Sequence, residues 1–380
     1  MATYRLNAED VDPLLEGLAI QGTGGGGSPD WGREILVNDL ARGRSLEIID
    51  PDDLPDSSLV VSGGIMGSVK TFEQIGVKEL VQRWETDFEL LRATRTMEHY
   101  LHRSVDYVVP FEVGGLNTPV ILSLAARLGT AAVNGDALGR SAPETQMTSF
   151  IMHGISLTPM PLVDAAGNAI VVTEQDQPTF ADEIGRWMVT RGGGMGANNH
   201  YPMSGADLKR TVVPGTITQA MEIGRELQRA RAVGEDPVAA ASAVLGARPL
   251  FRGVVADVSG EDVGGFYITN VVLDGRGGYA GGPAKLVIKN ETMALWVDGA
   301  LRAVFPDHVC MLDPATGRGI MSVEITEGTE MALVGYPCHA RLRSGLSSAA
   351  GQVSFGGARY GHPQLGFAPI EELNAQMPGW

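Results

Sequence analysis

The sequence predicts two domains, an α/β N-terminal domain with a mostly parallel sheet and a β-rich α+β C-terminal domain. Three observations support this prediction: a length of 380 residues, alternating strand and helix patterns in the first half, and a series of short strand patterns after residue 249. The predicted domains are 1–165, which carries the glycine loop and the polar block described below, and 166–380.

The first elements are predicted from a helix cap and from hydrophobic periodicity. Asn7 is placed to cap a helix that ends at the glycine-rich stretch 22–29. Its apolar residues lie at helical spacing on one face: Val11, Leu14, Leu15 and Leu18. Strand patterns follow at 45–50 and 57–68, and a long amphipathic helical pattern covers 72–103.

A strand–helix–strand unit is the clearest signal in the sequence. A buried strand is predicted at 104–115, a helix from Asn117 as N-cap to Gly129 as the residue after its end, and a second strand at 130–136. A unit of this length implies a parallel pair with a right-handed crossover. A further helix is predicted from Pro143, which favours the first helical position.

The second half of the chain has a different pattern. Residues 158–168 are predicted to form a turn-rich connector, followed by helices at 181–196 and 216–234. From Pro249 onward, short β-rich runs alternate with Gly, Asp and Asn turns, which is typical of an antiparallel sheet.

Composition excludes several classes of protein. The chain has 29 Lys and Arg against 45 Asp and Glu, a formal net charge of −16, and no run of basic residues, so no nucleic-acid partner is expected. No window is long and apolar enough for a membrane span, and the N-terminus has no signal-peptide pattern, so we expect a cytoplasmic protein without membrane contact. Two cysteines, Cys310 and Cys338, are too few for a disulfide framework or a four-cysteine zinc site.

Polar residues follow two neighbouring strands of the predicted parallel sheet. Glu112 follows the first strand and Asp136 the second, so both carboxylates are expected at the same edge, where open parallel sheets bind ligands. Arg140 and Glu144 follow within eight residues of Asp136. This convergence predicts an active site, although each residue taken singly is also explained as a cap or an ion-pair partner.

His153 lies near the end of the helix predicted from Pro143. It is a candidate metal ligand or acid/base group, and its alternative role is to interact with the helix dipole. Further along, Cys338 and His339 are adjacent, but neighbouring residues in a strand point to opposite faces, so a nucleophile–base pair is not expected.

A run of glycines follows the first predicted helix. Gly24, Gly25, Gly26 and Gly27 lie in GTGGGGSP, which lacks the Lys of a P-loop and follows a helix rather than a strand. No nucleotide cofactor is therefore expected. The loop is left with two interpretations, a nest of backbone amides for an anionic substrate or a tight turn beside the sheet.

Several motifs occur together in a recognisable order: GTGGGGSP, FEVGGLNTPVILSLAARLG, NGDALGRSAPETQMTSFIMHG, NNHYPM, KNET and FPDH. In this combination the sequence resembles the S-methyl thiohydantoin desulfurase family, over most of the chain. The block from Asn134 to Glu144 is the most specific part. Two local departures, Asn134 and the pair Ser141-Ala142, bear on the identity of the substrate.

The resemblance implies two domains and a hydrolase that releases methanethiol from an S-methylated thiohydantoin, or acts on a related five-membered ring. Replacing a thiomethyl group by water requires an activated water and a proton donor. Asp136 with His153 is a candidate site for a divalent metal such as zinc, or Asp136 acts as the base directly.

The predicted roles follow from this reaction. Asp136 and Glu144 are expected as metal ligand or base and Glu112 as a second carboxylate, while Arg140 and Asn117 orient the substrate and the glycine loop completes an anion pocket. Four C-terminal residues lie in matching family segments and could face the cleft: Asn290, Glu291, Pro306 and Asp307.

Two alternatives remain open. One is a hydrolase of an unmodified cyclic amide or imide of the hydantoin type, and the other is a non-catalytic subunit of a hydantoin-catabolic complex. The expected partners are a small-molecule substrate and further copies of the chain in a homo-oligomer.

Overall fold

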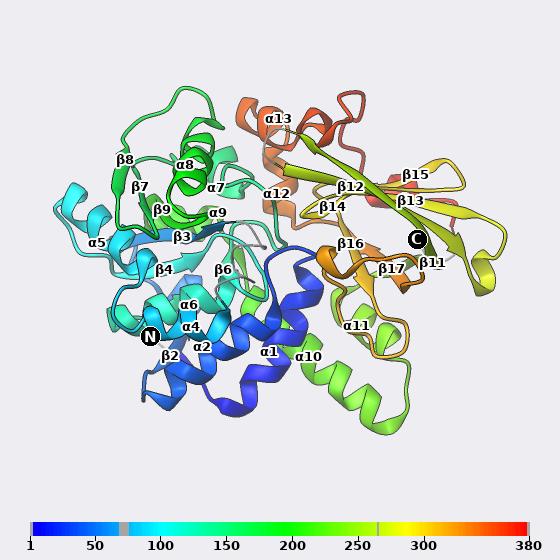
Figure 1. Cartoon of the computed structure of the whole chain (residues 1–380), viewed down its shortest axis with the longest axis horizontal. Helices are drawn as coiled ribbons and strands as arrows, with labels where there is room; N and C mark the ends of the chain where they lie inside the picture. Colours follow the sequence, from blue (N-terminus) through cyan, green and yellow to red (C-terminus); the bar gives the residue numbers. More distant parts are fainter. Residues whose placement is uncertain (1–2, 68–75, 264–265, 378–380) are drawn as a thin grey trace.

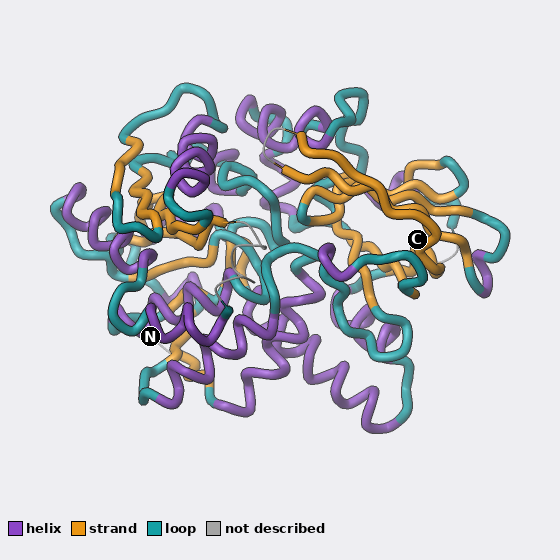
Figure 2. Tube along the Cα trace, viewed as in Figure 1, coloured by secondary structure: helices purple, strands orange, loops and turns teal. Residues whose placement is uncertain are grey.

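The computed structural model describes residues 3–67, 76–263 and 266–377, whose strands form two large sheets and one short two-stranded pair (Figure 1). Figure 2 shows the strands gathered in two groups, with long helices around the N-terminal group. This arrangement confirms the predicted fold class, an α/β domain followed by a β-rich domain with helices.

The N-terminal sheet has eight strands in the order β1-β2-β5-β4-β3-β9-β7-β8. The four strands β2, β5, β4 and β3 run parallel, and the outer strands pair antiparallel. The strand bounds are β1 (Thr3–Leu6), β2 (Leu46–Ile49), β3 (Leu59–Gly67), β4 (Tyr107–Pro110), β5 (Ala132–Val133), β7 (Met160–Asp164), β8 (Ala169–Val172) and β9 (Met195–Ser204). The carboxyl ends of the parallel strands therefore meet at one edge.

Helices cover both faces of this sheet. In Figure 1, α1, α2 and α6 lie on one side of it and α8 on the other. The helices of this half are α1 (Ala8–Gln21), α2 (Pro29–Ala41), α4 (Val77–Arg83), α5 (Glu89–Leu101), α6 (Asn117–Leu128), α7 (Ser149–Met152), α8 (Phe180–Arg191), α9 (Gly205–Thr211), α10 (Thr216–Val233) and α11 (Pro237–Leu245). Strand β3 reflects this double burial, because Val60 packs in one core cluster and Val61 in the other.

Helix α1 illustrates how sequence determines local structure. The predicted cap is confirmed, since the Asn7 side chain accepts from the Glu9 amide at 2.8 Å and the Asp10 carboxylate accepts from the Asn7 amide at 3.0 Å. The helix packs closely against α10, where a Cβ on Gly224 would lie 1.9 Å from the Pro13 carbonyl oxygen. Glycine is required at this crossing because it has no side chain.

The C-terminal sheet is antiparallel, with seven strands in the order β15-β14-β13-β12-β11-β17-β16. Its strands are β11 (Arg248–Val263), β12 (Phe266–Gly275), β13 (Pro283–Lys289), β14 (Glu291–Val297), β15 (Ala300–Val304), β16 (His308–Leu312) and β17 (Glu330–Tyr336). Three short helices end the chain: α12 (Ala340–Gly345), α13 (Ala349–Phe355) and α14 (Ile370–Leu373). The two-stranded pair is β6 (Gly135–Asp136) with β10 (Val213–Pro214).

Two predicted helices differ from the structure. The helix predicted from Pro143 is wrong: residues 143–148 form an irregular loop, and α7 begins only at Ser149, capped by the Thr148 side chain. The helical pattern at 72–103 contains two helices, α4 and α5, and its first residues, 72–75, lie outside the described part of the chain.

The predicted turn-rich connector also differs from the structure. The predicted connector, 158–168, contains β7 and the turn into β8, and these two strands pair antiparallel. Strands β8 and β9 both lie wholly after residue 165, yet both belong to the N-terminal sheet. Strands of the C-terminal sheet begin only at Arg248.

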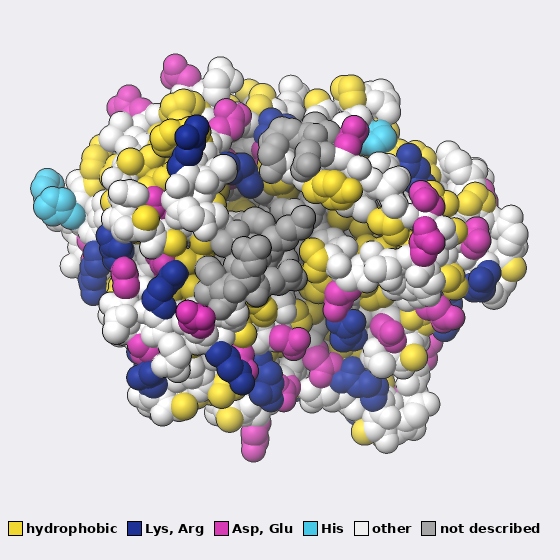
Figure 3. Space-filling view, viewed as in Figure 1, with side chains coloured by type: hydrophobic (Ala, Val, Ile, Leu, Met, Phe, Trp, Pro, Cys, Tyr) yellow, Lys and Arg dark blue, Asp and Glu magenta, His cyan; other side chains and the backbone are white. Residues whose placement is uncertain are grey.

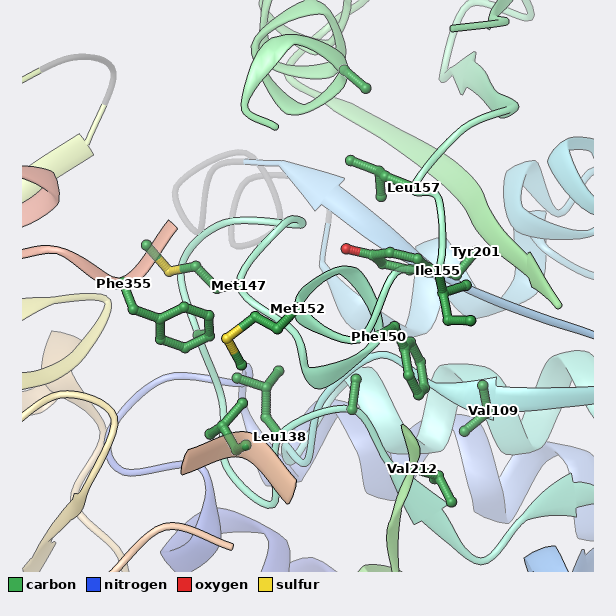
Figure 4. Close-up of a cluster of buried hydrophobic side chains, with 14 of the residues drawn as sticks. Val109, Leu138, Met147, Phe150, Met152, Ile155, Leu157, Tyr201, Val212 and Phe355 are labelled. Atoms are coloured by element: carbon green, nitrogen blue, oxygen red, sulfur yellow. The ribbon is translucent and has the colours of Figure 1, made fainter. Parts of the chain in front are cut away.

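One of the hydrophobic clusters spans the two halves. A single cluster of buried residues joins Leu138 and Phe150 of the N-terminal half to Phe305 and Phe355 of the C-terminal half. In Figure 4, Phe355 lies beside Met152 at this junction. This cluster connects the N-terminal half to the C-terminal half.

Two further features of the described residues bear on contact with a membrane or with a nucleic acid. None of their helices is both long and apolar enough to cross a membrane. On the face drawn in Figure 3, basic side chains are interspersed with acidic ones, and the described residues there form no continuous basic patch.

Candidate functional site

Two buried glutamates, one from each half, form the centre of the candidate site. Glu112 follows β4 by two residues, and Glu291 is the first residue of β14; they are 3% and 2% exposed. Burial, and next the neighbouring Glu291 carboxyl, raise the pKa of Glu112 well above its usual value. Burial also raises the pKa of Glu291 to about 8. The pair therefore retains at least one proton at neutral pH.

The two carboxyl groups differ in their hydrogen bonds. Glu112 accepts from the Ala142 amide at 2.6 Å and from the Asn117 side-chain amide, so both its oxygens have donors. Glu291 accepts from the Gly26 amide, and its other oxygen, Oε2, is buried without a partner among the described residues. Donors favour the ionised form of Glu112, whereas an unpartnered buried oxygen favours a protonated Glu291.

Asn117 has a different role from the one that its position predicts. It was expected to cap α6, but the helix begins at Asn117 itself, with Leu116 as the preceding residue and no side-chain cap. The Asn117 side chain instead holds the Glu112 carboxylate. Asn117 is thus in direct contact with one member of the pair formed by Glu112 and Glu291, which we call the acid pair.

The glycine loop lies against the acid pair. A Cβ on Gly25 would lie 1.8 Å from Glu291 Oε1, and a Cβ on Gly26 would lie 2.6 Å from the Gly114 Cα. Gly24, Gly26 and Gly27 have φ of +93°, +74° and +81°, in the left-handed region that glycine favours. Only a chain without side chains can approach Glu291 this closely.

Asp136 lies behind the pair and is fully buried. Both of its oxygens accept from backbone amides, Leu138 at 2.9 Å and Gly139 at 2.9 and 3.0 Å. Burial raises its pKa to about 7 despite these donors. Its charge also contributes to the raised pKa of Glu112, so the three carboxyl groups form one electrostatic unit.

Arg140 connects the two halves without meeting a carboxylate. Its guanidinium lies 4.6 Å above the Phe305 ring, and it has no ion-pair partner among the described residues. It donates to five oxygens: Ser141 O at 3.0 Å, Pro306 O at 3.1 Å, Asp307 O at 2.8 Å, Thr292 O at 2.9 Å and Thr23 Oγ1 at 3.2 Å. All of its donors are therefore used within the protein.

Glu144 is occupied by two cations of the C-terminal half. Lys289 and Arg359 both form ion pairs with it, the Arg359 Nε lying 3.1 Å from Oε1, and Gln146 donates at 2.8 Å. Burial raises its pKa, but Arg359 and Lys289 outweigh this and lower the pKa below its usual value. A carboxylate held in this way is suited to joining the domains.

The proposed metal ligands do not fit a metal site. His153 Nε2 lies 2.7 Å from the Arg341 carbonyl oxygen, and both oxygens of Asp136 are used by amides. Within residues 3–67, 76–263 and 266–377, no three or more His, Cys, Asp or Glu side chains are grouped so as to hold a metal ion. The residues therefore do not fit the predicted zinc site, and zinc remains only a prediction.

A second group of polar atoms at the same edge was missed by the sequence analysis. Ser62 of β3 pairs in register with His200 of β9, and both are 1% exposed. Within the described residues, the Ser62 hydroxyl and both ring nitrogens of His200 have no hydrogen-bond partner. Burial lowers the pKa of His200 to about 3, so the ring is neutral. The ring of Phe111, the residue before Glu112, lies edge-on to the His200 ring, with 5.9 Å between the two ring centroids.

Comparisons with known proteins show to which family the chain belongs. Family models described as the S-Me-THD-like N-terminal and C-terminal domains match residues 9–174 and 175–369. A crystal structure of a protein from Chromobacterium violaceum is similar, with a TM-score of 0.75 and 22% identity over 97% of this chain and 100% of that one. This likeness concerns the fold alone. A search of curated proteins gave no match. Since the two models together cover most of its length, the chain belongs to the S-Me-THD-like family.

Proposed function

We propose that this chain is a hydrolase that acts on a hydantoin-like five-membered ring and releases methanethiol from an S-methyl thiohydantoin. The family assignment supports the ring chemistry. The buried pair of Glu112 and Glu291 carries the proposal: burial raises both pKa values, and when the two carboxyl groups share one proton, one is a base and the other an acid.

The first step adds water to the ring carbon that bears the sulfur. The Glu112 carboxylate takes a proton from water as its oxygen bonds to that carbon, and Glu291 donates its proton to the ring nitrogen. The product is a neutral tetrahedral intermediate that carries a hydroxyl group and the thiomethyl group.

The second step breaks the carbon–sulfur bond. Glu291, now ionised, takes the hydroxyl proton as the carbonyl forms, and the departing sulfur takes the proton from Glu112. Methanethiol and the ring carbonyl are the products, and both glutamates return to their starting states. No metal ion enters this sequence, in keeping with the donor groups described above.

Other predicted residues position this pair. Asn117 and the Ala142 amide orient Glu112, and the glycine loop holds the backbone against Glu291. Asp136 and Arg140 set the local charge, because they alter the pKa values of Glu112 and Glu291 respectively. Glu144 joins the halves of the molecule rather than touching the pair.

Release of a thiol tests this proposal directly. The purified chain is incubated with an S-methyl thiohydantoin, and free thiol is measured with a chromogenic disulfide reagent. We expect catalytic release that falls by about 10²-fold or more in Glu112→Gln and Glu291→Gln, typical of a lost acid or base. The exposed control Glu183→Gln should retain activity.

Two other outcomes would reassign the protein. Ring opening of unmodified hydantoin without thiol release from the S-methyl compound would favour the cyclic-amide hydrolase. Inactivity on both rings, together with full pathway activity of Glu112→Gln in cells, would favour the non-catalytic subunit.

A further inference from the structure

A pocket with a volume of about 460 Å³ lies between α10 and the strands β16 and β17. It shares no lining residue with the acid pair or with the glycine loop. Its polar lining comes from both halves of the molecule: Thr216, Gln219 and Glu222 from α10, and His308, Tyr336 and His339 from the C-terminal half.

The N-terminus of α10 forms one wall. Gly215 precedes the helix and donates to the Asn134 carbonyl at 2.8 Å, and the Asn134 side chain accepts from the Thr218 amide at 3.2 Å. The amides of Thr216 and Ile217 have no acceptor among the described residues. An 18-residue helix therefore presents its positive end and open donors at the pocket.

Buried polar side chains without partners form a second, independent feature. His308 is 1% exposed, and its Nδ1 has no hydrogen-bond partner in the part of the chain that the structure describes. Thr216 is 3% exposed, and its hydroxyl lies close enough to Asp136 to lower the pKa of that carboxyl, although it makes no hydrogen bond of normal geometry within the described residues. Buried polar atoms are usually paired in folded proteins, so these two groups are consistent with a ligand that supplies the missing partners.

The remaining lining suits a flat or apolar ligand body. The ring of His308 stacks on Tyr336 with centroids 4.0 Å apart and an angle of 18° between the rings. Pro337 and Leu245 add apolar surface. The pocket thus combines hydrogen-bond donors on one wall with ring faces and aliphatic groups on the other.

Charges of both signs lie near the pocket, and the buried Asp136 carboxyl is beside Thr216. Gly139 lines the pocket, and the next residue, Arg140, is fully buried without a carboxylate partner. Its charge acts on His308, because it adds to the effect of burial in lowering the pKa of that ring. Against this, Glu222 contributes an exposed carboxylate to the lining.

We propose that this pocket binds a small organic acid, with its carboxylate at the N-terminus of α10 and its flat or apolar body against His308 and Tyr336. The Thr216 hydroxyl and the open amides donate to the carboxylate, as helix N-termini do to anions. The site does not depend on the hydrolase function proposed above, because it uses different residues.

Binding of benzoate, compared with its neutral isostere benzamide, tests the proposal. Each compound is titrated into the full-length protein by isothermal calorimetry at pH 7 in low-chloride buffer. We expect one saturable benzoate site per chain, with benzamide binding about tenfold or more weakly because it has no charge for the helix terminus.

Three variants locate the site. Thr216→Val removes the hydroxyl and should weaken benzoate binding about tenfold, as expected for a lost hydrogen bond to a charged group. Glu222→Gln should strengthen benzoate binding and leave benzamide unchanged, because repulsion is removed. Thr190→Val, at an exposed site on α8, should change neither.

The results that would overturn the proposal are equally specific. Equal affinity for benzoate and benzamide, no benzoate binding, or unchanged affinity in both Thr216→Val and Glu222→Gln would each do so. Glu222→Gln alters an exposed side chain, so its result stands even if Thr216→Val fails to fold.

Discussion

Two buried glutamates show how surroundings decide the state of a residue. Glu144 meets Lys289 and Arg359, and its pKa falls below the usual value in spite of burial. Glu291 meets no such ion pair, and burial raises its pKa to about 8. The same side chain is therefore a fixed anion at one position and a proton donor at the other.

The raised pKa of Glu291 predicts the pH dependence of activity. If Glu291 acts as the acid, it works only while protonated, so kcat/KM for thiol release should fall as the pH rises through about 8. Because Glu112 must be ionised to act as the base and its pKa is raised, kcat/KM should also fall toward lower pH. In Glu291→Gln, the residual activity should show no such alkaline decline, because amide protons do not titrate. A decline that persists unchanged in Glu291→Gln would assign it to another group.

At the scale of elements, local sequence patterns predicted those parts that local forces determine. The unit of β4, α6 and β5 has a continuous apolar pattern and ends α6 at Gly129, whose φ is +73°, so it could be predicted from its own residues. The helix predicted from Pro143 does not form, and in the loop found there Glu144 pairs with Lys289 and Arg359 of the C-terminal half. No local pattern indicates such partners.

The candidate site was predictable only in part, for the same reason. Glu112 and Asp136 follow strands whose parallel pairing could be predicted, and both lie at the expected edge. The pairing of Glu112 with Glu291 depends on how two sheets meet, which no residue spacing encodes. Ser62 and His200, whose buried polar atoms lack partners among the described residues, come together through the register of β3 with β9. That register was also not predicted.

The glycine loop provides a prediction at this scale. In Gly25→Ala the new Cβ would overlap Glu291 Oε1, so the carboxyl must move and thiol release should fall about tenfold or more, consistent with a displaced catalytic group. Gly278→Ala is a matched control, since a Cβ there meets no atom within 4 Å. Activity of Gly25→Ala equal to that of Gly278→Ala would show that Glu291 is not placed by this contact.

At the scale of the whole molecule, polar contacts join the two halves around the site. Arg140 donates to three carbonyls of the C-terminal half, those of Thr292, Pro306 and Asp307, and Glu144 binds Lys289 and Arg359. The acid pair itself takes one member from each half. The distance between the two carboxyl groups is therefore determined by how the two sheets are positioned relative to each other.

The Glu144 contact gives a prediction for the stability of the whole chain. In Glu144→Gln, Lys289 stays buried at 3% side-chain exposure without its counterion, so the free energy of unfolding should drop by about 3–5 kcal/mol, as when one partner of a buried ion pair is removed. Urea unfolding followed by circular dichroism measures this change, with the exposed Glu174→Gln as a control expected within about 0.5 kcal/mol of the parent.

A double variant separates loss of the ion pair from loss of packing. Combining Glu144→Gln with Lys289→Met removes the unpaired cation and keeps an unbranched apolar side chain at residue 289, so it should recover part of the stability lost by Glu144→Gln alone. Recovery would show that an uncompensated buried charge caused the loss. If the double variant is less stable than Glu144→Gln by the full effect of Lys289→Met, the two side chains are uncoupled, and the contact does not hold the halves together.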